Sequence, residues 1–292
     1  MKKFRHLVEY AFVRLFLFII DLMPLRVSTW IASRLADLIF AAATRRRAIA
    51  CDNIRRSGIA EDEADVRRIA KESFRHFSCL LVDTLKADRY LTAETWRDHV
   101  EMDVAPETYE LVNKPDQPVI LISGHIGNWE VAARIVSYLK PVVGIARKMN
   151  NPYVDRLIQK RKPTDRFKLT PKHDADMGRF ISTLRDGNVL AMLIDQHARE
   201  GGMMINFFGH PASTHRSYAM LHLITKIPIC FGYCVKTGPR QFKFKAIAPV
   251  SVEKSGNREA DVRAILTKLT GELEEAIRAY PEQYLWAHRR WR

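Results

Sequence analysis

The stretch Val119-Ile-Leu-Ile-Ser-Gly-His-Ile-Gly-Asn-Trp-Glu-Val131 predicts a buried strand, a tight turn and the first turn of a helix. Its apolar run at 119–122 follows a proline and ends at a Ser-Gly pair, which is typical of a buried strand. From Trp129 onward, apolar residues recur every three or four positions and indicate a helix. His125 lies in the turn, and Glu130 follows five residues later. Chemistry in α/β proteins is commonly placed at such strand-to-helix junctions.

His125 and Glu130 form a candidate catalytic pair. If the whole of 125–130 were helical, their side chains would point about 140° apart, given roughly 3.6 residues per turn. The pair can therefore meet only if His125 lies in the loop and folds back, which the two glycines of the loop make accessible. Gly127 or Asn128 can cap the helix, and Glu130 then lies in its first turn, where exposed N–H groups favour a carboxylate.

Such a pair supports general-base catalysis. A neutral imidazole takes the proton of an alcohol as the alcohol attacks a carbonyl, and Glu130 accepts from the other ring nitrogen and fixes the tautomer. The substrate hydroxyl attacks directly, so no nucleophilic Ser or Cys is required. The alternative is that His125 only ties the turn together, because the placement of a histidine is probabilistic evidence of catalysis.

The segment around this pair resembles the His-x4-Asp/Glu motif of glycerolipid-type acyltransferases. Its Gly-Asn-Trp-Glu form is similar to that of the bacterial lipid A late acyltransferases, the lauroyl/myristoyl acyltransferase family. Further blocks agree in order along nearly the whole chain: Arg147-Lys-Met-Asn-Asn-Pro-Tyr-Val-Asp155, Arg161, Ile194-Asp-Gln196, Gly201-Gly202, Phe207-Phe-Gly209 and Pro281-Glu-Gln-Tyr-Leu-Trp-Ala-His-Arg-Arg-Trp291.

The resemblance implies a membrane-associated O-acyltransferase. Such an enzyme moves a fatty acyl chain from a thioester to a hydroxyl of a lipid A precursor, with acyl carrier protein as the usual donor, coenzyme A as the other, and no further cofactor. His125 is then the general base, and Glu130 orients it. The substrate-binding residues that the resemblance implies are Asn128, Arg147, Arg161, Asp195 and Gln196.

Two of these residues have alternative roles. Asp195 either orients an acceptor hydroxyl or supports His125 through a shared network. Arg161 holds a phosphate or the thioester carbonyl oxygen as negative charge grows there, and Arg147 can serve the same anion. Lys160 and Lys162 flank Arg161, so the correspondence can be offset by one position.

Composition bounds the partners. The net charge of +14 over 292 residues predicts anionic partners: an anionic membrane lipid, a phosphorylated glycolipid acceptor and acyl carrier protein. Within the same class the acceptor is alternatively a lysophospholipid or a phosphatidylinositol mannoside. The alternative outside the enzymes is a non-catalytic basic protein that binds membranes or nucleic acid. Binding alone does not require the His125–Glu130 pair. No RNA-recognition or helix-turn-helix signature is present in the sequence, so we expect no nucleic-acid partner.

The cysteines and histidines indicate neither disulfides nor a metal. There is no Cys-x2-Cys, and Cys230 and Cys234 would lie roughly 13 Å apart on one strand face, too far to bridge. We expect packed thiols, as in a reducing cytoplasm. The spacing of the remaining candidate ligands matches no compact metal motif; these are His197, His210, His215 and His222.

The N-terminus predicts two helices, at 7–25 and 31–43, that lie in the bilayer interface. Charged residues interrupt the first stretch, and its longest apolar run, 15–20, is far short of the ~20 residues of a spanning helix. A marginal transmembrane anchor and an ordinary buried helix pair are the alternatives. We expect attachment to the cytoplasmic face of the inner membrane, with membrane-associated helices over 1–47 and the catalytic domain over 48–292.

The fold class predicted is α/β: a mixed, largely parallel sheet flanked by helices, with an N-terminal membrane-associated helical extension. The remaining strands are expected at 142–146, 167–169, 188–195, 228–235 and 241–250, and the remaining helices at 66–85, 151–159, 177–184 and 262–280. His125, Arg147 and Asp195 each follow a strand, so we expect them to converge at one sheet edge. Asn53 is expected in a surface link. Residues 201–209 predict either a mobile loop that closes over an acyl chain or a hairpin that buries two phenylalanines.

Overall fold

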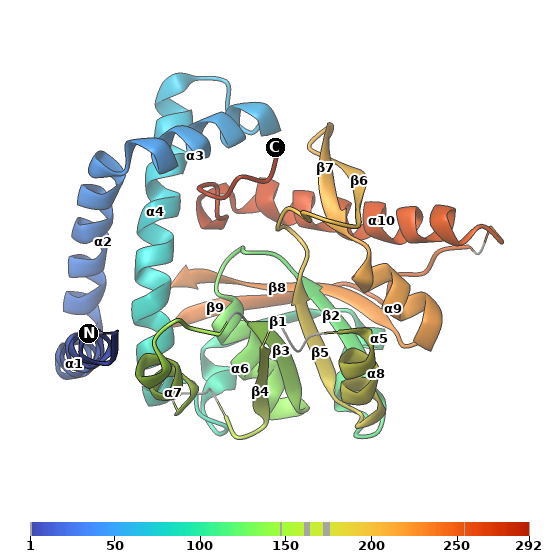
Figure 1. Cartoon of the computed structure of the whole chain (residues 1–292), viewed down its shortest axis with the longest axis horizontal. Coiled ribbons are helices and arrows are strands. Elements are labelled where there is room, and N and C mark those ends of the chain that lie inside the picture. The colour runs from blue at the N-terminus through green and yellow to red at the C-terminus, as the bar shows by residue number, and fades with distance from the viewer. Residues whose placement is uncertain (1, 147, 161–163, 172–175, 254, 292) are drawn as a thin grey trace.

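The sheet is the centre of the molecule. The structure is a computed structural model that describes residues 2–146, 148–160, 164–171, 176–253 and 255–291 (Figure 1). Its seven-stranded sheet has the order β1-β9-β8-β2-β5-β3-β4. Neighbouring strands are parallel except for the antiparallel pair β8–β9, so the predicted mixed, largely parallel sheet is confirmed. The strands are β1 Val100–Val104, β2 Val119–Ser123, β3 Val142–Ala146, β4 Phe167–Pro171, β5 Val189–Leu193, β8 Ile229–Gly238 and β9 Gln241–Ala246.

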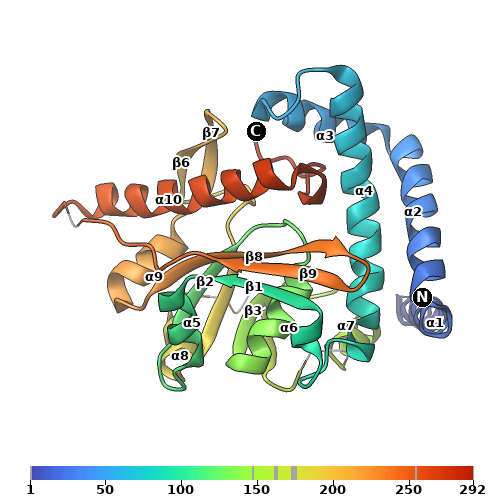
Figure 2. The same cartoon turned by 180° about the vertical axis from the view of Figure 1, so that it is seen from behind.

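Both faces of the sheet are covered, because β2 is apolar at every position of its run. Ile120 and Ile122 face a core that also contains Leu269. Val119 and Leu121 face the opposite core. This period-2 division is what a strand buried on two sides requires. On the first side lie α8 Met177–Arg185, α9 Ser217–Thr225 and α10 Arg258–Ala279; on the second lie α5 Pro106–Asn113 and α6 Trp129–Leu139 (Figures 1 and 2).

The segment after β5 forms a hairpin. β6 Gly202–Phe207 pairs antiparallel with β7 His210–His215. Phe207 and Phe208 are 1% and 6% exposed and join the core on the α10 side. Of the two alternatives for 201–209, the hairpin is therefore confirmed and the mobile loop over an acyl chain is wrong: the aromatic side chains are already buried.

The N-terminal region is a series of helices, α1 Lys2–Leu22, α2 Leu25–Ala42, α3 Thr44–Ser57 and α4 Glu63–Lys86. α2 runs alongside α4 in both views (Figures 1 and 2). Arg75 of α4 holds Asp37 of α2 at 2.7 Å. The boundary expected between 47 and 48 lies inside α3, so no break in the chain separates the two predicted parts there. α7 Pro152–Lys160 also contacts α1.

The outer surface of α1 and α2 is apolar and exposed. Phe4, Phe12, Leu22, Trp30 and Leu38 are each between 65% and 74% exposed. Large contiguous exposed apolar surfaces mark sites of interaction with proteins or membranes. These side chains are not buried, so the ordinary buried helix pair is wrong for this surface. Among the described residues, we find no helix whose length and hydropathy would let it span a membrane.

Candidate active site

Two adjacent parallel strands bring the site together. β2 and β5 are in register, with Ser123 opposite Leu193. Just beyond the ladder, the backbone N–H of Ile194 donates to the carbonyl of Ser123 at 2.9 Å. Because both strands end at the same edge, His125 and Asp195 leave the sheet side by side. The predicted convergence of these two residues is confirmed.

Asp195 binds His125 through both carboxylate oxygens. Oδ1 lies 2.8 Å from the ring Nδ1, and Oδ2 accepts from the His125 backbone N–H at 2.9 Å. The Asp195 side chain is 4% exposed and that of His125 is 14% exposed. An ionised carboxylate only accepts hydrogen bonds, so Nδ1 carries the proton and Nε2 carries the lone pair. Nε2 faces the exposed Gln196, whose side-chain nitrogen is 3.4 Å away.

The expected pairing of His125 with Glu130 is corrected by this geometry. Among the described residues, the hydrogen bonds of the His125 ring go to Asp195 and Gln196, and none goes to Glu130. Glu130 does lie in the first turn of α6, as predicted. There it accepts from the Trp129 side chain, and the Trp129 ring contacts the His125 ring edge-on, with centroids 5.1 Å apart.

The electrostatics favour an ion pair once His125 takes a proton. Burial by itself lowers the pKa of His125, but the charge of Asp195 and its hydrogen bond outweigh burial and raise the pKa above 6.5. Burial also pushes the pKa of Asp195 upward, yet the contacts with His125 hold it below 3.8. Burial raises the pKa of Glu130, against the Trp129 hydrogen bond and the charge of Arg134.

The turn that carries His125 depends on a glycine. Gly127 has φ of +58°, and a Cβ there would lie 2.0 Å from the carbonyl oxygen of Cys234. That approach lets the next residue, Asn128, donate its backbone N–H to the same oxygen at 2.7 Å. The carbonyl of Gly127 itself accepts from His76 Nε2 at 3.0 Å. Burial lowers the pKa of His76 to about 4, so the ring is neutral at pH 7.

Asn128 is a helix cap. Its Oδ1 accepts from the Val131 backbone N–H at 3.0 Å, which confirms one of the two predicted caps. Its side chain is 1% exposed, and its Nδ2 is buried without a hydrogen-bond partner in the described part of the chain. The Oδ1 of Asn128 thus serves the start of α6, and the substrate-binding role expected of this residue stays a prediction.

The C-terminal tail completes the site, and its role was not predicted from the sequence. The Leu285 backbone N–H donates to the His125 carbonyl at 3.0 Å, and Tyr284 forms an antiparallel bridge with Ile126. The buried phenol of Tyr284 hydrogen-bonds with Asp195, and the charge of Arg290 also acts on that carboxylate. The one sequence signal was the similarity of the tail to the family's ending.

Asn53 ties this tail to α3. Its Nδ2 donates to the carbonyls of Trp286 and His288 at 2.7 Å each. At 9% exposed it lies in the interior, so its expected place in a surface link is wrong. A side-chain amide is accommodated in the interior here because it satisfies two backbone carbonyls of the tail,.

The two arginines expected at the site, Arg147 and Arg161, lie outside the described residues, as does Lys162. Lys160 ends α7 and is exposed. Their roles stay predictions.

Comparison with known proteins gives the class of the site. The sequence model of the family described as "Bacterial lipid A biosynthesis acyltransferase" matches residues 1–292. The chain belongs to this family. It is an acyltransferase.

The relatives agree with this assignment at low identity. The chain is 21% identical over 278 residues to the lipid A biosynthesis palmitoleoyltransferase of Escherichia coli (strain K12), covering 92% of this chain and 86% of that protein. The figures are the same for the lipid A biosynthesis acyltransferase of Shigella flexneri. Among solved structures, the 1-acyl-sn-glycerophosphate acyltransferase of Thermotoga maritima aligns with a TM-score of 0.39 and 12% identity, over 85% of this chain and 97% of that one.

Proposed function

We propose that this acyltransferase moves a fatty acyl chain from a thioester to a hydroxyl of a lipid A precursor, with His125 as the general base and Asp195 as the group that orients it. The observation that carries the mechanism is the 2.8 Å contact between His125 Nδ1 and Asp195 Oδ1. It fixes the tautomer in which Nε2 carries the lone pair that accepts a proton. Family membership supports the acyl transfer and the glycolipid acceptor.

The reaction then follows in two steps. The acceptor hydroxyl gives its proton to Nε2 as its oxygen attacks the thioester carbonyl, and a tetrahedral oxyanion forms. Asp195 stabilises the imidazolium, which is consistent with the raised pKa of His125. When the oxyanion collapses, the C–S bond breaks, and the imidazolium returns its proton to the departing thiolate. The products are an ester and a free thiol, and His125 is again neutral.

Glu130 is proposed as a positioning residue that acts through Trp129. Its carboxylate accepts a hydrogen bond from the Trp129 side chain, and the Trp129 ring packs edge-on with the His125 ring. A ring fixed by a hydrogen bond and by an aromatic contact keeps Nε2 pointing in one direction, and catalysis depends on such fixed orientation. Arg161 remains the proposed partner of the developing oxyanion or of an acceptor phosphate.

Attachment to the cytoplasmic face of the inner membrane is proposed for the N-terminal helices. Exposed apolar side chains run along α1 and α2, from Phe4 to Leu38. Laid in the bilayer interface, this surface would be covered, and the donor could approach from the aqueous side. Acyl carrier protein is the proposed donor because an acidic carrier suits a chain of net charge +14,.

The test is transfer from acyl-loaded carrier protein to a lipid A precursor in detergent. His125→Ala should abolish the release of free thiol, and His210→Ala, which removes an exposed histidine from β7, should leave it unchanged. Equal melting temperatures of the two variants would show that the fold is intact. Full transfer by His125→Ala would refute the mechanism, and acylation of a lysophospholipid in preference to the glycolipid would refute the acceptor.

A further inference from the structure

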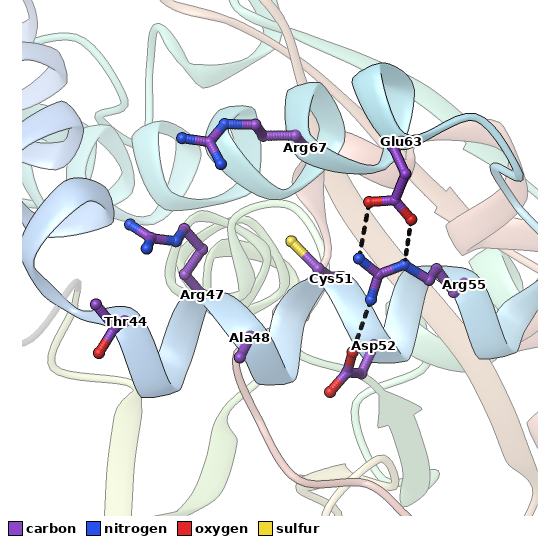
Figure 3. A pocket seen from close by; sticks show the side chains of 8 residues that line it. All are labelled: Thr44, Arg47, Ala48, Cys51, Asp52, Arg55, Glu63 and Arg67. Atoms are coloured by element: carbon purple, nitrogen blue, oxygen red, sulfur yellow. Dashed lines mark hydrogen bonds and ion pairs between the residues drawn. The ribbon is translucent and has the colours of Figure 1, made fainter.

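A cavity lies away from the catalytic residues, between α3 and the start of α4. Its volume is about 450 Å³, and none of its lining residues belongs to the His125 site. Figure 3 shows the side chains that line it, which are Thr44, Arg47, Ala48, Cys51, Asp52, Arg55, Glu63 and Arg67. Three of the eight are arginines, so the charge balance of the cavity decides what it can bind.

The charge is neutralised at one end of the cavity only. Arg55 pairs with both oxygens of Glu63, at 2.6 and 2.8 Å, and with Asp52 at 2.7 Å. Arg47 and Arg67 have no carboxylate within ion-pair distance among the described residues. Figure 3 shows their guanidinium groups on facing helices, both directed toward the side where Thr44 lies and away from the Arg55 cluster.

One aromatic ring contacts both of the arginines that lack a carboxylate partner among the described residues. The guanidinium carbons of Arg47 and Arg67 lie 5.6 and 5.7 Å from the centroid of the Phe40 ring. Arg47 also donates to the carbonyls of Phe40 and Ala41 through one nitrogen, at 2.8 Å each. Its other donors, and those of Arg67, make no hydrogen bond within the described part of the chain. Two guanidinium groups with free donors match the oxygens of a phosphate.

The start of α3 adds a second positively charged feature, the N-terminal end of a helix dipole. This 14-residue helix begins at Thr44, and the preceding residue, Ala43, provides no side-chain cap. Within the part of the chain that the structure describes, the first backbone N–H groups of the helix have no hydrogen-bond acceptor, so they are open to an anion, which the helix dipole favours there,. Since Thr44 also lines the cavity, the helix start and the two arginines can serve the same ligand.

The surroundings select the source of that phosphate. Phe40 lies near the end of α2, and the residues just before it, Leu35, Leu38 and Ile39, are 49%, 66% and 51% exposed. The exposed apolar surface thus ends where the free cations begin. An apolar helix face bordered by arginines is the arrangement that meets acyl chains on one side and headgroups on the other.

We propose that Arg47, Arg67 and the start of α3 bind the phosphate of an anionic phospholipid headgroup while the exposed face of α2 enters the bilayer. The site rests on the membrane attachment proposed above and adds to it a defined headgroup contact. It requires no step of acyl transfer. Attachment driven by the apolar face alone would show no preference for anionic lipid.

The test is flotation of the full chain with vesicles of phosphatidylcholine alone or mixed with phosphatidylglycerol, without donor or acceptor. Arg67→Gln should weaken binding to the anionic vesicles about tenfold, because it removes a charge-assisted contact. Its binding to phosphatidylcholine should stay that of the wild type. The matched control is Arg45→Gln, which removes the same charge from an exposed position on α3 that does not line the cavity; it should cost at most about fivefold, as one surface charge does.

Other outcomes overturn the proposal in distinct ways. Equal losses in Arg67→Gln and Arg45→Gln would show diffuse surface charge instead of a site. Calorimetric binding of inorganic phosphate that Arg67→Gln abolishes, with unchanged vesicle binding, would assign the cavity to a soluble phosphate. Wild-type chain that floats with neither vesicle would refute the membrane attachment itself. Leu38→Gln separates the apolar contribution of α2 from the phosphate contact of the arginines, because it should weaken binding to both vesicle types. Unchanged melting temperatures would exclude misfolding, since the Arg67 side chain is exposed.

Discussion

Replacing Asp195 with Asn tests the strongest contact of the site. In the wild type, one oxygen accepts from Nδ1 at 2.8 Å and the other from the His125 backbone N–H at 2.9 Å. In Asp195→Asn, the backbone N–H claims the amide oxygen, so the amide nitrogen faces Nδ1 and donates to it. His125 then carries its proton on Nε2, where the base must be unprotonated. By analogy with triads that lose their aspartate, kcat should fall about 10³–10⁴-fold.

The same change should alter the pH profile. A general base works in its neutral form, so wild-type kcat/KM should rise with pH through the raised pKa of His125, with a midpoint above 6.5. Asp195→Asn removes the charge that raises this pKa, and burial, which lowers it, then dominates. The acid limb of the residual activity should therefore move to lower pH.

The assay is thiol release from the acyl donor, followed across the pH range in detergent with a lipid A precursor as acceptor. Asp186→Asn, in the turn after α8, is the control for loss of one carboxylate. A variant Asp195→Asn with wild-type kcat, or with an unshifted acid limb, would refute the orienting role of Asp195. A larger loss in Glu130→Gln than in Asp195→Asn would restore Glu130 as the partner of the base.

Substitutions at four further positions give separate outcomes. Glu130→Gln keeps an acceptor for Trp129 and should cost less than about tenfold in kcat, whereas Glu130→Ala should cost more, as single-turnover kinetics would show; equal effects would contradict positioning through Trp129. Gly127→Ala should lower the melting temperature and the activity together, because its Cβ would overlap the Cys234 carbonyl; wild-type stability would contradict the close approach. Asn53→Ala should increase proteolysis of the C-terminal tail and reduce kcat, since the tail holds the His125 loop; a protected tail would contradict this link. Arg75 lowers the pKa of Asp37 to about 2, so the stability from this pair should be present above about pH 4 and lost toward pH 2. The melting temperature of Asp37→Asn should be lower than that of the wild type at pH 6 and similar to it at pH 2. A difference in melting temperature that stays constant with pH would contradict this linkage.

The sequence predicted the centre of the sheet because its central strands are buried on both faces. The apolar runs of β2, β5 and β8 carry a signal that no solvent-facing residue interrupts. β1 was not predicted, since its run Val-Glu-Met-Asp-Val at the sheet edge exposes Glu101 and Asp103. Nor was α9, whose all-round apolar composition has weak helical periodicity.

The site was predicted in part for the same physical reasons. Strand ends place His125 and Asp195 at one edge, and this depends only on the order and direction of the strands. Which carboxylate faces the ring depends on the path of the loop at Gly127, and spacing along the chain does not contain that path. The tail contacts of Tyr284 and Arg290 join residues far apart in sequence, so no local pattern could reveal them.

The central claim is that His125 accepts the hydroxyl proton during transfer of an acyl chain to a membrane glycolipid. Mass spectrometry of glycolipids from cells that carry the wild-type chain, the His125→Ala variant or neither tests it most directly. We expect one species heavier by a single acyl chain with the wild type only. The same heavier species with His125→Ala, or no mass difference between wild-type cells and cells without the chain, would contradict the account.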